Sequence, residues 1–137
     1  MADTKDTAPL ILVVEDNCTN AKLAGGMLTA RGYRVAFAVD GEQGFKLARQ
    51  LRPALVVTDL QMPGVDGLAL LQLLKSDPDT KAIPVAVLTA HVLPEHRSRA
   101  FQGNCCSFIA KPIRYQSFIA EIARILQDDL IGVSCDT

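Results

Sequence analysis

Short blocks of apolar residues recur along the chain, and most are followed by a segment in which apolar residues return every three or four positions. The blocks predict five strands, at Leu10–Val14, Arg34–Ala38, Leu55–Asp59, Pro84–Thr89 and Ser107–Ala110. The first, third and fourth blocks are almost continuously apolar, which is typical of strands covered by helices on both faces. Strands and helices that alternate with short connections indicate βαβ units. We therefore expect an α/β fold with a doubly wound, five-stranded parallel sheet in which these three strands are central.

The segments between the strands carry start and stop signals of helices. Polar residues that can accept a hydrogen bond from the first helical turn precede several segments, and glycine or proline follows. The expected helices are one capped by Asn17 and stopped by Gly32, one capped by Asp40 with Gln43 and ended by Pro53, one from Asp66 to about Ser76, a short polar one after Pro94, and an amphipathic one with Phe118, Ile119, Ile122, Ile125 and Leu126 on one face.

Two adjacent glycines, Gly25 and Gly26, fall inside the first predicted helix. Each glycine costs about 1 kcal/mol relative to alanine in a helix interior. The pair indicates either a close backbone approach or a locally soft helix. The sequence leaves both interpretations open.

The composition is that of one folded domain. A chain of 137 residues that is 49% hydrophobic lies near the commonest domain size and can bury a sizeable core. We expect an N-terminal extension at residues 1–9, a folded domain at residues 10–127 and a C-terminal tail at residues 128–137. No repeat, linker or low-complexity segment indicates a second domain.

Charge and hydropathy exclude two classes of partner. The 14 basic and 15 acidic residues nearly cancel, and no run of Lys or Arg forms the basic patch of a nucleic-acid binder. No apolar stretch approaches the roughly 18 to 20 residues that cross a bilayer, and no secretory signal precedes the first strand. We therefore expect a cytoplasmic protein that binds neither nucleic acid nor membrane.

The cysteines have no metal-site spacing. Cys18, Cys105, Cys106 and Cys135 form no paired motif with His91 or His96, so the sequence predicts reduced thiols and no zinc site. The adjacent Cys105 and Cys106 could bind a soft metal or sense oxidation, but small residues that lead into a strand are the commoner reading of such a pair.

Polar residues stand where four of the predicted strands end. They are Glu15 and Asp16, Asp59, Thr89, and Lys111. In an open parallel sheet the carboxyl ends of the strands border the ligand-binding crevice, so these side chains are expected to converge. Carboxylates attract Mg²⁺, and a hydroxyl and an amine can hold phosphoryl oxygens. Each residue alone is more often a cap or a surface charge, but together they predict a phosphoryl-accepting site.

The order of the motifs resembles the receiver domain of two-component response regulators, of the CheY-like kind. The matching runs are Val-Val-Glu-Asp-Asn after the first strand, Thr-Asp-Leu-Gln-Met-Pro-Gly-Val-Asp-Gly at the third, Leu-Thr-Ala at the fourth and Phe-Ile-Ala-Lys-Pro at the fifth. The resemblance covers about Leu10 to Leu126. It implies a flavodoxin-like (βα)5 fold with strand order 2-1-3-4-5.

The resemblance implies a role for each matching residue. Asp59 would accept the phosphoryl group of a phosphohistidine as an aspartyl phosphate, and Lys111 would hold the phosphoryl oxygens. Mg²⁺, the expected cofactor, would bind to Glu15, Asp16 and Asp59 and to the backbone carbonyl of Gln61. The protein would thus assist its own phosphorylation and dephosphorylation without acting on an external substrate.

Further positions are implied to control the phosphorylated state. Thr89 and Phe108 match the switch pair, in which the hydroxyl moves to the phosphoryl group and the ring turns inward. Gln61 and His91 match positions that tune dephosphorylation, and Pro112 matches a position that commonly follows a cis peptide bond. The output face would be formed by the helix after Pro94, the fifth strand and the last helix.

The implied partners are a histidine kinase or histidine phosphotransfer protein as donor and a downstream protein target. We expect a monomer, with the output face as the surface for any dimer. Three alternatives stay open at this point: a phosphorylation-independent pseudo-receiver, a receiver excised from a hybrid histidine kinase, and an aspartyl-nucleophile phosphatase. The phosphatase fits worst, because Gln61 stands where such enzymes carry a second aspartate.

Overall fold

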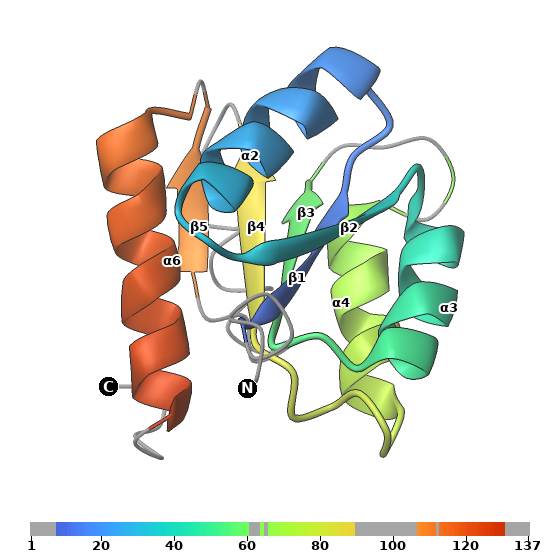
Figure 1. Ribbon diagram of the computed structural model, residues 1–137. Helices are drawn as coiled ribbons and strands as arrows, with labels where there is room; N and C mark the ends of the chain where they lie inside the picture. The colour runs from blue at the N-terminus through green and yellow to red at the C-terminus, as the bar shows by residue number, and fades with distance from the viewer. Residues whose placement is uncertain (1–7, 61–63, 65, 90–106, 112, 131–137) are drawn as a thin grey trace.

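A parallel sheet of five strands forms the centre of the molecule, shown as a computed structural model in Figure 1. The structure describes residues 8–60, 64, 66–89, 107–111 and 113–130. The strands are β1 (Leu10–Val14), β2 (Arg34–Ala38), β3 (Leu55–Asp59), β4 (Val85–Thr89) and β5 (Ser107–Ala110). Their order is β2-β1-β3-β4-β5, and every neighbouring pair is parallel. The predicted doubly wound fold is therefore confirmed.

The strand bounds agree with the apolar blocks except at β4. This strand begins at Val85, one residue later than predicted, because Pro84 has no N–H to donate to the ladder. Its carbonyl oxygen still accepts a hydrogen bond from the backbone N–H of Val56, at 3.0 Å. β3 and β4 are buried along their whole length, and β1 is buried from its second residue, as expected for central strands.

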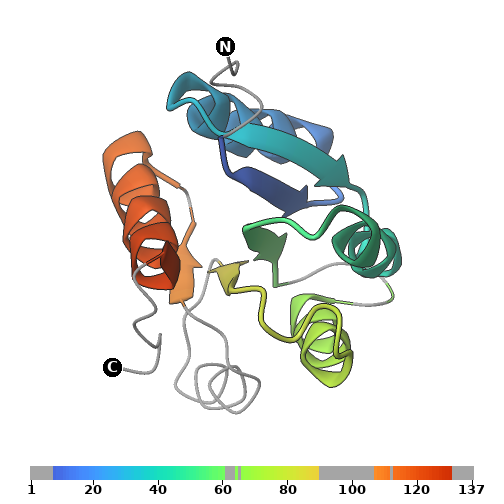
Figure 2. The same cartoon turned by 60° about the horizontal axis from the view of Figure 1, so that its bottom comes forward.

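The described helices cover both faces of the sheet (Figures 1 and 2). They are α2 (Cys18–Ala30), α3 (Gly41–Leu51), α4 (Gly67–Ser76) and α6 (Tyr115–Leu130). Successive residues of a strand point to opposite faces, so β1 sends Leu12 and Val14 into one core and Ile11 and Val13 into the other. The first core lies against α3 and α4, and the second against α2 and α6. The predicted apolar face of the last helix, from Phe118 to Leu126, lies in the second core.

The three predicted N-caps are confirmed. The side chains of Asn17, Asp40 and Asp66 each accept a hydrogen bond from a backbone N–H in the first turn of α2, α3 and α4. At the start of α3 a second hydrogen bond runs in the opposite direction. The Gln43 side chain reaches back, and its Oε1 accepts from the backbone N–H of Val39 at 2.7 Å. These caps satisfy donors that a helix start leaves without partners within the helix, and they set where each helix begins.

Asp40→Ala is expected to lower the free energy of unfolding by about 1 kcal/mol, because it removes the acceptor of the Gln43 N–H. Asp40→Asn keeps a capping oxygen and should leave stability nearly unchanged. Urea unfolding of both variants measures the difference. Equal stability of the alanine and asparagine variants would show that the cap contributes nothing.

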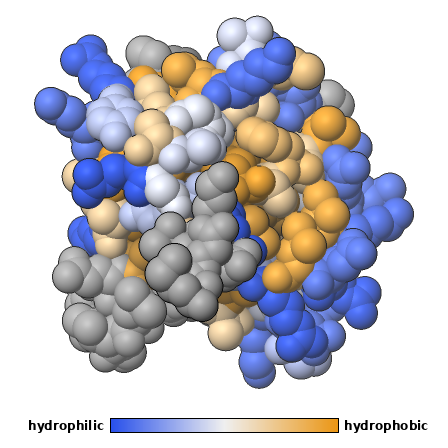
Figure 3. All heavy atoms as spheres, viewed as in Figure 1, coloured by the Kyte–Doolittle hydropathy of each residue, from blue (hydrophilic) through white to orange (hydrophobic). Residues whose placement is uncertain are grey.

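A close approach is found at Gly25, but it is made by a side chain and not by another backbone segment. A Cβ atom at Gly25 would lie 2.4 Å from Cζ of Phe37, so the ring on β2 rests against the helix backbone. At Gly26 a Cβ would meet nothing within 4 Å. Phe37 is 48% exposed and Val39 59%, and Figure 3 shows apolar surface on this face of the molecule.

The end of α2 follows the predicted stop. Gly32 has φ +95°, and the backbone N–H of Tyr33 reaches back to the carbonyl of Leu28 at 3.1 Å. The final helix, by contrast, continues to Leu130, past Asp128 where the sequence places the start of the tail. The domain boundaries themselves remain predictions.

The short helix predicted after Pro94 lies outside the described residues. Within the part of the chain that the structure describes, no helix has the length and apolar character needed to cross a bilayer.

Candidate functional site

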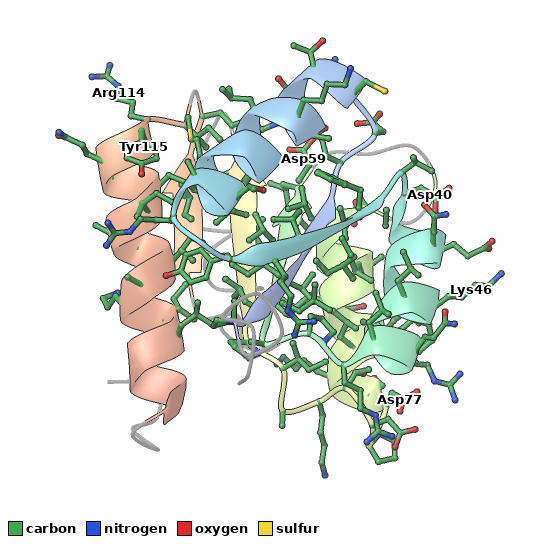
Figure 4. The ribbon with its side chains drawn as sticks, viewed as in Figure 1. Asp40, Lys46, Asp59, Asp77, Arg114 and Tyr115 are labelled. Carbon is green, nitrogen blue, oxygen red and sulfur yellow. The ribbon has the colours of Figure 1, made fainter. Side chains whose placement is uncertain are left out.

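Polar side chains gather at the carboxyl edge of the sheet, as the sequence predicts. Glu15 follows β1, Asp59 and Thr89 end β3 and β4, and Lys111 follows β5. The backbone N–H of Lys111 donates to the carbonyl of Thr89 at 2.8 Å, which brings the end of β5 to the end of β4. Glu15, Asp59 and Thr89 are at most 7% exposed. Figure 4 shows Asp59 at this edge, away from Asp40, Lys46 and Asp77 on the side of α3 and α4.

Three carboxylates form a cluster at this edge. Glu15, Asp16 and Asp59 each offer an oxygen within 4.8 Å of the others, and Asp16 is the exposed member. Hard oxygen donors at this spacing fit Mg²⁺, which is bound through carboxylates and keeps several water ligands. Acidic groups on open surfaces often gather without a metal, but two of these three are buried. The donor set therefore fits the predicted cofactor.

The ammonium of Lys111 points into the carboxylate cluster. Its Nζ lies 2.8 Å from Oδ1 of Asp59 and 3.5 Å from Oε1 of Glu15. Burial by itself lowers the pKa of Lys111, but the hydrogen bond to Asp59 and the charges of Asp59 and Glu15 outweigh burial and raise it. Lys111 is therefore held in its charged form next to Asp59.

Neighbouring groups shift the pKa of Glu15 in opposite directions. Burial and the nearby negative charge of Asp59 raise its pKa, while the backbone N–H of Asn17 and the charge of Lys111 act to lower it, and the net direction is upward. The Asn17 N–H donates to Oε2 of Glu15 at 3.2 Å, so the start of α2 orients this carboxylate. The cluster thus has an excess of negative charge that a divalent cation would relieve.

Two residues near Asp59 were missed by the sequence analysis. Thr58 is fully buried and donates its hydroxyl to the backbone carbonyl of Asp59 at 3.0 Å. Gly67, the first residue of α4, donates its N–H to the carbonyl of Leu60 at 2.9 Å. A hydroxyl residue inside an otherwise apolar strand was the available signal for Thr58. Gly67 carries no comparable signal, because a glycine after a capping aspartate is ordinary at a helix start.

A solvent-open hollow lies beside Lys111. Its lining comes from the end of β1, α2, β4 and the segment after β5. The lining residues are Glu15, directly after β1, and Asn20, Leu23, Leu88, Lys111 and Ile113. Leu23, Leu88 and Ile113 give the hollow an apolar side, and Glu15, Asn20 and Lys111 a polar one. The arrangement leaves room for an incoming group to approach the polar edge between α2 and the start of α6.

Several predicted site residues lie outside the described structure. Gln61, His91 and Pro112 are among the residues that it does not describe, as are Cys105 and Cys106. Phe108 lies in β5, paired with Val87, but its side chain is not described. The roles assigned to these four site residues stay predictions. Cys18 is an exposed free thiol.

Comparisons with known proteins agree with this geometry. The family model of the response regulator receiver domain matches residues 11–123. The polar-differentiation response regulator DivK of Brucella anthropi is 37% identical over 118 residues, which is 86% of this chain and 96% of that protein.

Two solved receiver domains of histidine kinases have the same fold. The one from Syntrophus aciditrophicus has a TM-score of 0.80 and 32% identity and covers 88% of this chain and 91% of its own. The one from a sensor kinase of Pseudomonas aeruginosa, solved with a magnesium ion coordinated in the active-site cleft, has a TM-score of 0.76 and 29% identity and covers 95% of this chain and 99% of its own.

Proposed function

The chain belongs to the response regulator receiver domain family, and from this premise we propose that it accepts a phosphoryl group on Asp59 from a phosphohistidine. The observation that carries the proposal is the 2.8 Å contact between Lys111 Nζ and Asp59 Oδ1 within the cluster of Glu15, Asp16 and Asp59. A buried carboxylate at a strand end would thereby lie between the ammonium of Lys111 and the acids that we propose as metal ligands. This is what a phosphoryl acceptor requires.

In the proposed reaction, a carboxylate oxygen of Asp59 attacks phosphorus while the P–N bond of the donor breaks. The electron pair of that bond returns to the imidazole, and an aspartyl phosphate remains. Lys111 neutralises phosphoryl charge as a point charge, and Glu15 and Asp16 would hold the metal. Bound Mg²⁺ would supply further charge neutralisation at the phosphoryl oxygens. The backbone carbonyl of Gln61 is the remaining proposed ligand.

The proposed response to phosphorylation begins at Thr89. Its buried position at the end of β4, next to the backbone of Lys111, supports a role of its hydroxyl in binding the phosphoryl group. Phe108 would follow by turning inward, and the output face would change shape. Gln61 and His91 would set the lifetime of the aspartyl phosphate, and a cis bond before Pro112 would direct Lys111.

Partners follow from the family. A receiver domain implies a histidine kinase as the source of phosphate, directly or through a phosphotransfer protein. We propose that the chain is a cytoplasmic monomer that signals by binding a downstream protein and turns over no external substrate. The hollow beside Lys111, which Leu23, Leu88 and Ile113 line on its apolar side, supports an approach of the donor's imidazole from this side.

The comparisons also support a second setting for this domain, as part of a histidine kinase. Two of the similar solved structures are receiver domains of histidine kinases, so a receiver that works inside a hybrid kinase is the alternative setting for the same chemistry. A pseudo-receiver is disfavoured by the intact contacts among Asp59, Glu15 and Lys111. An aspartyl-nucleophile phosphatase would reveal itself by turnover of a phosphomonoester.

The test is intact-mass measurement after incubation with phosphoramidate, with Mg²⁺ in one sample and EDTA in the other. We expect the mass of one phosphoryl group to be gained only with Mg²⁺. Borohydride reduction and peptide mapping should then place the modification on Asp59. Modification at another carboxylate, or an equal gain with EDTA, would contradict the proposal.

A further inference from the structure

The start of α4 lies directly against the backbone of Asp59. A Cβ atom at Gly67 would lie 2.4 Å from the carbonyl oxygen of Asp59, 2.8 Å from Cα of Leu60 and 3.1 Å from the carbonyl carbon of Asp59. All three neighbours are backbone atoms, so none can turn away as a flexible side chain can. The helix therefore lies so close to the peptide group of Asp59 that no side chain fits between them, and only glycine can occupy this position.

Both partners of this contact are held in place. On the helix side, Leu70, Leu71 and Leu74 of α4 are buried in the core. On the strand side, the backbone N–H of Leu60 donates to the carbonyl of Leu88 at 2.8 Å, and the Thr58 hydroxyl donates to the carbonyl of Asp59. A hydrogen bond also joins the two sides directly, because the Gly67 N–H donates to the carbonyl of Leu60. Neither side can yield without moving the other.

Conformational freedom does not explain this glycine. The described glycines with positive φ are Gly32 and Gly64, so the backbone of Gly67 is one that alanine adopts without strain. Alanine is also the better helix former. Glycine is therefore needed at position 67 because the backbone of Asp59 leaves no space for a side chain there.

We propose that Gly67 is a positioning residue for the phosphoryl acceptor, acting through the backbone carbonyl of Asp59; this rests on the proposed phosphorylation of Asp59. By resting on that carbonyl, α4 fixes the depth at which the Asp59 carboxylate meets Lys111 and the two metal-binding acids. Phosphoryl transfer depends on such placement, and a displacement of about 1 Å of a reacting group can cost roughly a hundredfold in rate.

The test compares Gly67→Ala with Gly26→Ala. Both place a methyl group in a helix, but at Gly26 it would meet nothing within 4 Å. We expect Gly67→Ala to slow phosphorylation by phosphoramidate and Mg²⁺ about ten- to a hundredfold. It should also shift the NMR amide signals of Asp59 and Leu60. Gly26→Ala should match the wild type in rate and at these amides.

Loss of stability needs a separate control. Ile122→Val shortens a fully buried side chain of α6 and is expected to destabilise the fold without touching the site. If it slows phosphorylation as much as Gly67→Ala does, the effect is general and the positioning role is wrong. Should Gly67→Ala not fold, Thr58→Val removes the other contact to the same carbonyl. This variant should also slow phosphorylation, but by a smaller factor than the one expected for Gly67→Ala. An unchanged rate would overturn the role of that carbonyl.

The outcomes separate the two proposals. A wild-type protein that takes up no phosphate contradicts the proposed function, whatever the variants do. A wild type that is phosphorylated, with Gly67→Ala equal to Gly26→Ala in rate and amide signals, contradicts the positioning role alone.

Discussion

Asp59→Asn is expected to take up no phosphoryl group under conditions in which the wild-type protein is fully modified. The amide differs from the carboxylate by a single substituent and fills nearly the same space at the end of β3, but it is not a nucleophile for phosphorus. Glu15 and Asp16 remain as acids, yet the ammonium of Lys111 lies closest to Asp59. Intact mass after incubation with phosphoramidate and Mg²⁺ measures the loss.

Stability should respond differently from activity in this variant. Asp59 lies among like charges, and its charge contributes to raising the pKa of Glu15. Its removal loses the ion pair with Lys111 but relieves that repulsion, so without Mg²⁺ the two effects on the free energy of unfolding oppose each other and the protein should stay folded. Asp40→Asn makes the same chemical change at a helix cap and should be phosphorylated normally. Phosphate on Asp59→Asn would show that another residue is the acceptor.

The sheet was predictable because its strands are continuous apolar blocks bounded by polar residues. β1 and β3 begin and end where the sequence places them, and the strand-end residues Asp59 and Lys111 meet as the topology requires. Their convergence follows from parallel pairing alone, which puts every carboxyl end at one edge. The order of the strands came from the family resemblance and not from periodicity.

Contacts between backbone and distant segments were not predictable. The ring of Phe37 against Gly25 joins a strand to a helix, and no local pattern distinguishes that glycine from Gly26 beside it. Gly67 has the sequence of an ordinary helix start after a capping aspartate, and its contact with Asp59 exists only once α4 is packed. The last helix runs to Leu130, past Asp128 where the sequence places the start of the tail, because a hydrogen-bonded helix can continue without any composition signal that marks its final turn.

Lys111→Met is expected to lower the rate of phosphorylation roughly a hundredfold, since one preorganised charge that stabilises a transition state is worth about this much. Methionine keeps an unbranched side chain of similar length in a position where the lysine side chain is 24% exposed. The charge is therefore the main loss. Time courses of intact mass with phosphoramidate and Mg²⁺ give the rate. Lys46→Met, on α3 and away from the site in Figure 4, is the matched control and should react like the wild type.

A pH comparison separates the charge of Lys111 from its packing. Lys111 acts to lower the pKa of Glu15, so its removal should raise that already elevated pKa further. A carboxyl whose pKa is higher in the folded than in the unfolded state stabilises the fold below its unfolded pKa and loses this contribution as the pH rises through the folded pKa. Without Mg²⁺, the loss of stability in Lys111→Met should therefore be larger at neutral pH than near the ordinary glutamate value of 4.5. An equal loss at both pH values would assign the effect to packing, and a normal phosphorylation rate would remove Lys111 from the proposed chemistry.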